Sequence, residues 1–101
     1  MSEKDLTLKE QLGDLVGKIA KRIDENCTNY EKDTYLKWID CIEENRKCDM
    51  MNDINTRLFH CSAKMVMYPN YCNEFNPYYR VRQLCLDILN RIQCDKEGST
   101  E

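Results

Sequence analysis

Seven cysteines constrain this chain of 101 residues more than any other feature. Six of them lie between residues 41 and 94 and are nested around Pro69. The inner two flank that proline, and the next two each lie thirteen positions further out. The symmetry predicts a helical hairpin that turns near Pro69 and is tied across its two arms. From the middle outwards the six are Cys61 and Cys72, Cys48 and Cys85, and Cys41 and Cys94.

The composition predicts an all-α protein with one domain, residues 1–101. Charged residues make up 33% of the chain, and there are only three glycines and two prolines, which is typical of helices with a solvated surface. The 18 acids and 15 bases are interspersed, so we expect no nucleic-acid partner. The apolar runs are too short to cross a bilayer, so the chain is expected to be peripheral to a membrane at most.

Apolar residues at spacings of three and four predict the helices. We expect an amphipathic helix over about 6–26 and a second helix from about 30 to 47, which Thr28 or Asn29 could cap. A kink or second cap is expected at 49–53. The cysteine-stapled helical region is expected to span about 30–94. Asn76 and Pro77 are a strong helix start, because Asn caps well and Pro suits the first helical position. The polar segment 95–101 is predicted to be disordered.

The number of cysteines also bears on the compartment. Reducing compartments rarely maintain disulfides, yet the first residues show neither the apolar core of a secretory signal nor an Arg-rich presequence. The mitochondrial intermembrane space reconciles these observations, because it oxidises small helical proteins that arrive without a cleaved presequence. The alternative is a cytosolic helical protein whose cysteines are small core residues.

The motifs that would indicate catalysis or a cofactor are missing. No two cysteines lie two to four residues apart, so neither a zinc site nor a Cys-x-x-Cys redox motif is expected. His60 precedes Cys61, but neighbouring helical residues point about 100° apart, so the histidine is not expected to activate that sulfur. We therefore predict a protein that is not an enzyme and has no cofactor.

An aromatic stretch after the proline is a candidate surface for a protein partner. Tyr and Arg are enriched among the residues that dominate binding energy at interfaces. The alternative is a loop that buries its own aromatic rings. The candidate residues are Tyr71, Phe75, Tyr78, Tyr79 and Arg80.

Residues 41–94 resemble the coiled-coil-helix-coiled-coil-helix proteins of the mitochondrial intermembrane space, in which nested disulfides join two antiparallel helices. The spacing differs, because twelve residues separate Cys48 from Cys61 and twelve separate Cys72 from Cys85, more than is usual in that family. The segment from Cys41 to Cys48 is also similar to a cysteine-containing accessory subunit of respiratory complex I. The resemblance implies a non-enzymatic accessory subunit or assembly factor of a respiratory-chain complex, with protein partners.

The resemblance also implies how the cysteines are used. We expect Cys61 to pair with Cys72, Cys48 with Cys85 and Cys41 with Cys94, while Cys27 stays free or competes for Cys94. Trp38 and Cys41, one helical turn apart, are expected to form the docking point for the import oxidase. The alternative is that Trp38 is simply the largest residue of the core. The alternative function is a secreted or viral disulfide-rich helical protein that acts as a ligand or inhibitor.

Overall fold

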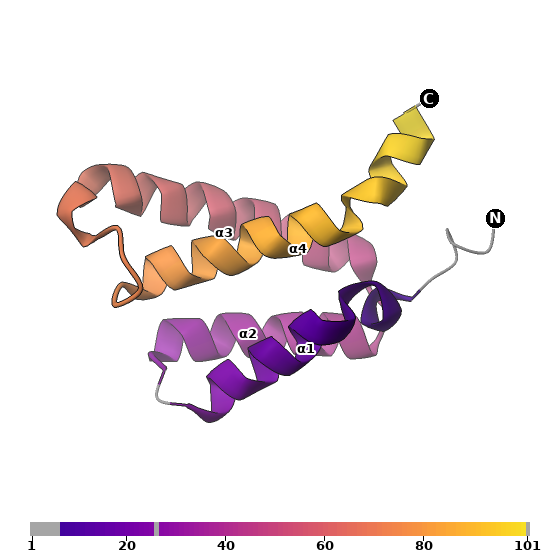
Figure 1. Cartoon of the computed structure of the whole chain (residues 1–101), viewed down its shortest axis with the longest axis horizontal. Coiled ribbons are helices and arrows are strands. Elements are labelled where there is room, and N and C mark those ends of the chain that lie inside the picture. Colours follow the sequence, from indigo (N-terminus) through magenta and orange to yellow (C-terminus); the bar gives the residue numbers. More distant parts are fainter. Residues whose placement is uncertain (1–6, 26, 101) are drawn as a thin grey trace.

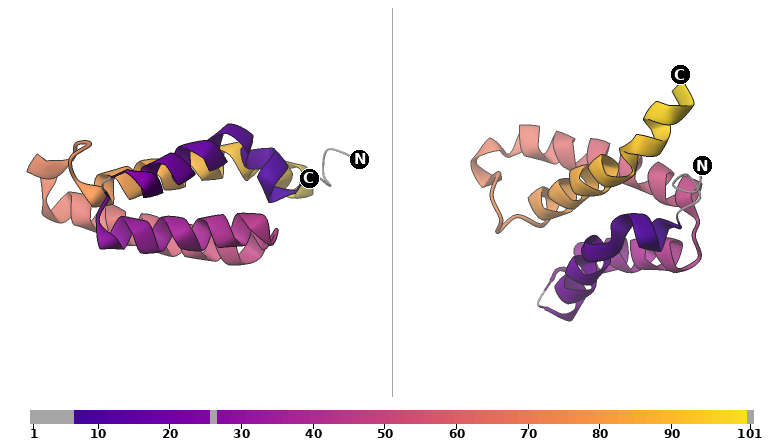
Figure 2. Two further views of the ribbon diagram at one scale, coloured as in Figure 1. Left: turned by 90° about the horizontal axis from the view of Figure 1, so that it is seen from below. Right: turned by 45° about the vertical axis from the view of Figure 1, so that its right-hand side comes forward.

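The protein is a four-helix bundle built from two helical hairpins (Figure 1). The structure, a computed structural model, describes residues 7–25 and 27–100, and among these it describes the side chains of all but residue 71 and residues 93–100. Helices α1 and α2 form one hairpin, and α3 and α4 form the other. Seen from the side, α1 and α4 form one layer and α2 and α3 the other (Figure 2). The helices therefore run up, down, up and down, and the all-α prediction is confirmed.

Helix α1 spans Leu8–Asp24 and begins with a capping box. The Thr7 side chain accepts a hydrogen bond from the Glu10 N–H, and the Glu10 carboxylate accepts one from the Thr7 N–H. Gly13, about one and a half turns after the start of the helix, has non-helical dihedral angles and kinks it. The apolar face predicted from the spacing is buried: Leu8, Leu12, Leu15 and Ile19.

Helix α2 spans Asn29–Glu43, and Thr28 is its N-cap, one of the two caps proposed from the sequence. Here too a capping box forms, because Glu31 stands three positions after the threonine. The helix ends earlier than predicted. Its buried residues include Trp38 and Cys41.

The corner between α2 and α3 corrects the predicted boundaries. Helix α3 spans Lys47–Met67 without interruption, so the kink expected at 49–53 is wrong. The chain instead turns at Asn45, whose φ of 55° is left-handed. The Arg46 N–H donates to the Cys41 carbonyl at 2.8 Å, and the Asn45 N–H donates to the Ile42 carbonyl at 3.2 Å. This pair of bonds is a Schellman motif, which asparagine tolerates better than most residues, so α2 stops here.

Asn45 also joins the corner to the first helix. Its side-chain oxygen accepts a hydrogen bond of 2.8 Å from the Leu8 N–H, one of the donors that α1 cannot satisfy internally. Asn45 thus ends α2 through its backbone and caps α1 through its side chain.

The second hairpin turns where the sequence predicts it. Helix α3 ends at Met67, the short 3₁₀ helix η2 spans Pro69–Tyr71, and α4 begins at Pro77. The Tyr78 N–H donates to the Asn76 side chain at 2.9 Å, so the predicted Asn-Pro start is confirmed. Helix α4, Pro77–Thr100, continues through the segment 95–100 that we expected to be disordered, and its last turns extend beyond the bundle (Figure 1).

The four helices share one hydrophobic core. Trp38 is its largest side chain and is fully buried, as are Tyr35 and Met50. Three cysteines also belong to it, which shows that part of the cysteine content serves as small apolar core residues. The three are Cys41, Cys61 and Cys85.

The corner generates a prediction. Asn45→Gly keeps the left-handed turn accessible but removes the acceptor for Leu8, so it should lower the free energy of unfolding by about 1 kcal/mol. Asn45→Ala loses the acceptor and also strains the turn, so it should cost about 1–2 kcal/mol more. Asn45→Asp keeps both features and is the control. Urea titration measures all three, and equal costs for Gly and Ala would contradict this role for the turn.

Candidate functional site

A buried ion pair joins the start of α2 to the start of α4. The Arg80 guanidinium donates from Nη2 to Oε1 of Glu31 at 2.6 Å and from Nε to Oε2 at 2.8 Å. The Tyr35 hydroxyl also donates to Glu31 Oε2, at 3.1 Å. Glu31 is 0% exposed, and its lone pairs are satisfied by these donors and by Thr28. A buried carboxylate is stable only with such a set of partners.

The contacts decide the charge state of Glu31. Burial alone would raise the pKa of this carboxyl, but the donors from Arg80, Thr28 and Tyr35 outweigh burial and hold the pKa below its ordinary value. The carboxylate therefore stays charged and serves packing rather than proton transfer.

The same arginine also holds the loop before α4. Its Nη1 donates to the Glu74 carbonyl, so the loop that follows η2 is tied to the bundle. Arg80 was expected at a partner surface, but its guanidinium is occupied by Glu31 and Glu74, and its side chain is only 15% exposed.

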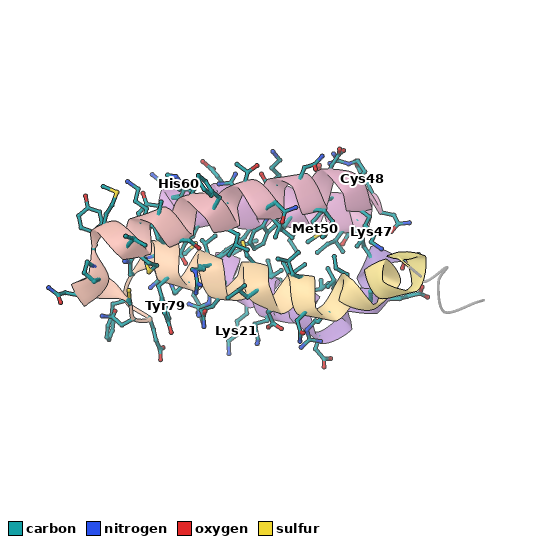
Figure 3. The ribbon with its side chains drawn as sticks, turned by 90° about the horizontal axis from the view of Figure 1, so that it is seen from above. Lys21, Lys47, Cys48, Met50, His60 and Tyr79 are labelled. Carbon is teal, nitrogen blue, oxygen red and sulfur yellow. The ribbon has the colours of Figure 1, made fainter. Side chains whose placement is uncertain are left out.

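An aromatic cluster lies beside this pair, where α2, α3 and α4 meet. The ring centroids of Tyr30 and Tyr78 are 5.1 Å apart, and the His60 ring is 5.6 Å from that of Tyr78. Arg57 stands over the Tyr30 ring at 5.4 Å and Lys64 over the Tyr78 ring at 5.4 Å. Tyr78, expected at a partner surface, is thus half-buried between helices. His60 is labelled on α3 in Figure 3.

The remaining surface candidates differ in position. Phe75 is 90% exposed at the tip of the second hairpin. A shallow apolar groove of about 320 Å³ lies there, lined in part by Phe75 and Tyr68. Tyr79 is half-buried near Arg80, and the side chain of Tyr71 lies outside the described residues. Of the four candidates whose side chains are described, only Phe75 is prominently exposed.

Trp38 and Cys41 are core residues in the folded protein. The Trp38 indole N–H donates to Asp53 Oδ2 at 2.7 Å, and Arg57 donates to the same oxygen at 2.9 Å. Burial raises the pKa of the Cys41 thiol. Both side chains are 0% exposed, so an oxidase would reach them only before folding.

The cysteines are distributed over several environments. Cys48 and Cys72 are exposed and Cys27 is half-buried, whereas the other three described cysteines are buried. All six are free thiols in this fold, so neither Cys61 with Cys72 nor Cys48 with Cys85 is at bonding distance. The side chain of Cys94 lies outside the described residues, and with it the pair Cys41 with Cys94.

The continuity of α3 places Cys48 and Cys61 on different faces of the helix. Thirteen positions at about 100° each place Cys48 about 140° around the helix from Cys61. Cys61 therefore points into the core while Cys48 points to solvent, and α4 cannot meet both.

Cys61 and Cys85 are the two cysteines that the hairpin brings together. They lie on the paired helices α3 and α4, and both are 0% exposed. Burial, and next the neighbouring Cys61, raise the pKa of the Cys85 thiol to about 12. Burial also raises the pKa of Cys61, whose sulfur is 3.6 Å from the Tyr30 hydroxyl. Such thiols are poor nucleophiles, which argues against thiol catalysis by the folded protein.

Two searches of the structure bear on other functions. Among the side chains described, no three His, Cys, Asp or Glu residues are arranged to hold a metal ion. No helix within the described ranges has the length and apolarity to span a membrane.

Comparison of the chain with protein-family models, curated proteins and solved structures gives no match.

Sequence reasoning missed two features of the site. The burial of Glu31 was not predicted, because its partner Arg80 is 49 positions away and only the fold brings the two together. The capping box at Thr28 placed Glu31 at the helix start but could not reveal its burial. The exposure of Phe59 and Val66, both on α3, was also missed, although their spacing of seven residues puts them on one helix face.

The ion pair predicts a dependence of stability on pH. The folded pKa of Glu31 lies below its unfolded value, so its contribution is complete above the unfolded pKa and is lost as pH falls through the folded pKa. Stability should therefore begin to fall below about pH 5. Glu31→Gln should lower the free energy of unfolding at pH 7 by about 3 kcal/mol, because Arg80 loses its charged partner.

The control is Asp33→Asn, an exposed acid on the same helix. Denaturant titrations at several pH values measure both variants. If Glu31→Gln leaves the acid limb of the stability curve unchanged, the pair does not control it.

Burial predicts which thiols react. With its pKa at about 12, Cys85 should react with a maleimide roughly a thousandfold more slowly at neutral pH than an ordinary thiol, and burial slows it further. In reduced protein, Cys48 and Cys72 should be labelled first, and the three core cysteines only after unfolding. Peptide mass spectrometry after brief labelling, with a sample in urea as control, measures the order. Rapid labelling of Cys41 or Cys85 without urea would contradict this core.

Proposed function

We propose that this protein is a non-enzymatic accessory subunit or assembly factor of a mitochondrial respiratory-chain complex, folded oxidatively in the intermembrane space. The observation that carries the proposal is the antiparallel α3–α4 hairpin with a buried cysteine on each arm. This arrangement supports the resemblance of residues 41–94 to the twin-cysteine hairpin proteins, although the spacing differs. The buried ion pair and the raised thiol pKa values favour a structural over a catalytic role.

The hairpin also suggests which cross-link would staple it. In the oxidised protein we expect a disulfide between Cys61 and Cys85, since both lie in the interface between α3 and α4. This pair replaces the expected pairs of Cys61 with Cys72 and of Cys48 with Cys85, because each sulfur can form only one disulfide. To form this disulfide, the two helices must approach each other locally. A disulfide oxidant must also take up two electrons while each thiol loses a proton.

The import step uses the unfolded chain. Trp38 and Cys41 are adjacent on one helical face and are buried after folding, so docking to the import oxidase must precede the closure of the core. Trapping of a mixed disulfide should be abolished by Cys41→Ser and weakened by Trp38→Ala in unfolded precursor.

The test is subcellular fractionation with immediate alkylation of thiols. The proposal predicts that the protein is recovered between the two mitochondrial membranes, that its intact mass shows at least one disulfide, and that a peptide map joins Cys61 to Cys85. Cys85→Ser should lower the free energy of unfolding in both conditions. Without reductant the loss should be about 2–4 kcal/mol larger than with it, because only then is the disulfide present in the parent protein. Cys72→Ser, at an exposed site, is the matched control. Recovery from the cytosol with every thiol alkylated would overturn the proposal, and recovery from the medium with disulfides would favour a secreted ligand or inhibitor.

A further inference from the structure

Helix α3 has two apolar faces, and only one of them is covered. Its inner face contributes Met50, Ile54 and Cys61 to the core. At about 100° per residue, a second set of apolar residues lies between about 140° and 240° from Cys61, on the opposite side. We call this set the outer face of α3: Phe59, Ala63, Val66 and Met67.

The outer face is open to solvent. Phe59 is 79% exposed, Val66 80% and Met67 61%. The spacing of i, i+4, i+7 and i+8 is that of a helix seam, and it extends for about 12 Å along α3. At the end of the helix it meets the exposed hairpin tip, where Tyr68 and Phe75 line the apolar groove. Exposed large apolar residues that form one stripe mark an interaction site, whereas scattered ones do not.

Charge is nearly absent from this region. Charged residues make up 33% of the chain, yet Glu74 is the only one between residues 65 and 79. Two cations that lie close to the outer face in the sequence are engaged elsewhere: Lys64 stands over the Tyr78 ring, and Arg57 is bonded to Asp53. Depletion of charge with enrichment of aromatic residues and Met is characteristic of the core of protein interfaces.

We propose that the outer face of α3 and the adjoining tip bind a helix of a partner protein that presents an uncharged apolar stripe. The inference rests on the proposed role as a protein-binding subunit and names the surface used. A charge on the partner stripe would be buried against Phe59 and Val66 without an opposite charge, which costs several kcal/mol at an apolar contact. A helix laid along the seam would place its own apolar residues at matching intervals.

Size and charge favour this occupant over two others. The outer face extends for only about 12 Å along α3, so two copies that met through it would bury a small area. Stable specific complexes bury roughly 800 Å² on each partner, which a larger protein reaches by wrapping around the hairpin. An anionic bilayer would find no cation in residues 65–79, and Glu74 would be repelled by it.

The test uses the full chain with a photoreactive benzoylphenylalanine at position 59 or 66. Leu36, on α2 and 47% exposed, is the matched control position. After illumination in the native cells, peptide mass spectrometry identifies what is bound. The proposal predicts that positions 59 and 66 link to the same segment of one other protein, that this segment has uncharged apolar residues at helical spacing, and that position 36 does not reach it.

A second variant separates binding from folding. With the photoreactive residue at Met67, changing Phe59 and Val66 together to Ser should reduce the cross-linked product roughly tenfold or more. The melting temperature should change little, because both side chains are exposed. Three results would each overturn the proposal. The first is cross-links only to a second copy, and the second is equal cross-linking from position 36. The third is binding of the purified protein to phosphatidylserine vesicles that is abolished by the two serines. The cross-linking readout does not depend on the thiol state or the compartment. The proposed surface can therefore be wrong while the proposed compartment is right, and the compartment can be wrong while the surface is right.

Discussion

The bidentate contact between Glu31 and Arg80 organises more of this molecule than any other single interaction. Glu31 lies in the first turn of α2 and Arg80 in the first turn of α4, so the contact crosses the bundle from one hairpin to the other. Through the Glu74 carbonyl the same guanidinium fixes the loop that leads to the exposed tip. The position of Phe75 therefore depends on an ion pair that lies in the interior.

The bundle follows from local signals that agree with one another. Two capping boxes start the first two helices, a Schellman motif at Asn45 turns the chain, and Asn76 starts the last helix. Each is worth about 1–2 kcal/mol, so the fold depends on their agreement and on the apolar core. Cysteines contribute to that core as small side chains, and this role is independent of whether any of them is oxidised.

Much of the fold could be predicted because its signals are local. The turn at Pro69 and the cap at Asn76 depend on residues a few positions apart, and the structure confirms both. The end of α2 was misplaced because asparagine in a left-handed turn has no distinctive sequence signature, unlike glycine. The burial of Glu31 could not be predicted, since its partner is supplied by the tertiary fold alone.

The candidate site was predicted only in part for the same reason. An aromatic stretch indicated a surface, but the fold divides it: Tyr78 packs between helices while Phe75 stays exposed. The outer face of α3 was hidden in the sequence because Phe59 and Val66 share the helix with an equally apolar inner face. A periodic pattern with two opposite apolar faces indicates a helix covered on both sides, and in this chain only one cover is present.

A double-mutant cycle on Glu31 and Arg80 measures how strongly this ion pair joins the two hairpins. The free energies of unfolding of the parent protein, Glu31→Gln, Arg80→Met and the double variant are measured at neutral pH. The account predicts that the two changes are strongly coupled, with an interaction energy of about 2 kcal/mol or more, because each single change leaves a buried charge without its partner. Additive effects of the two changes would show that the ion pair does not hold the two hairpins together.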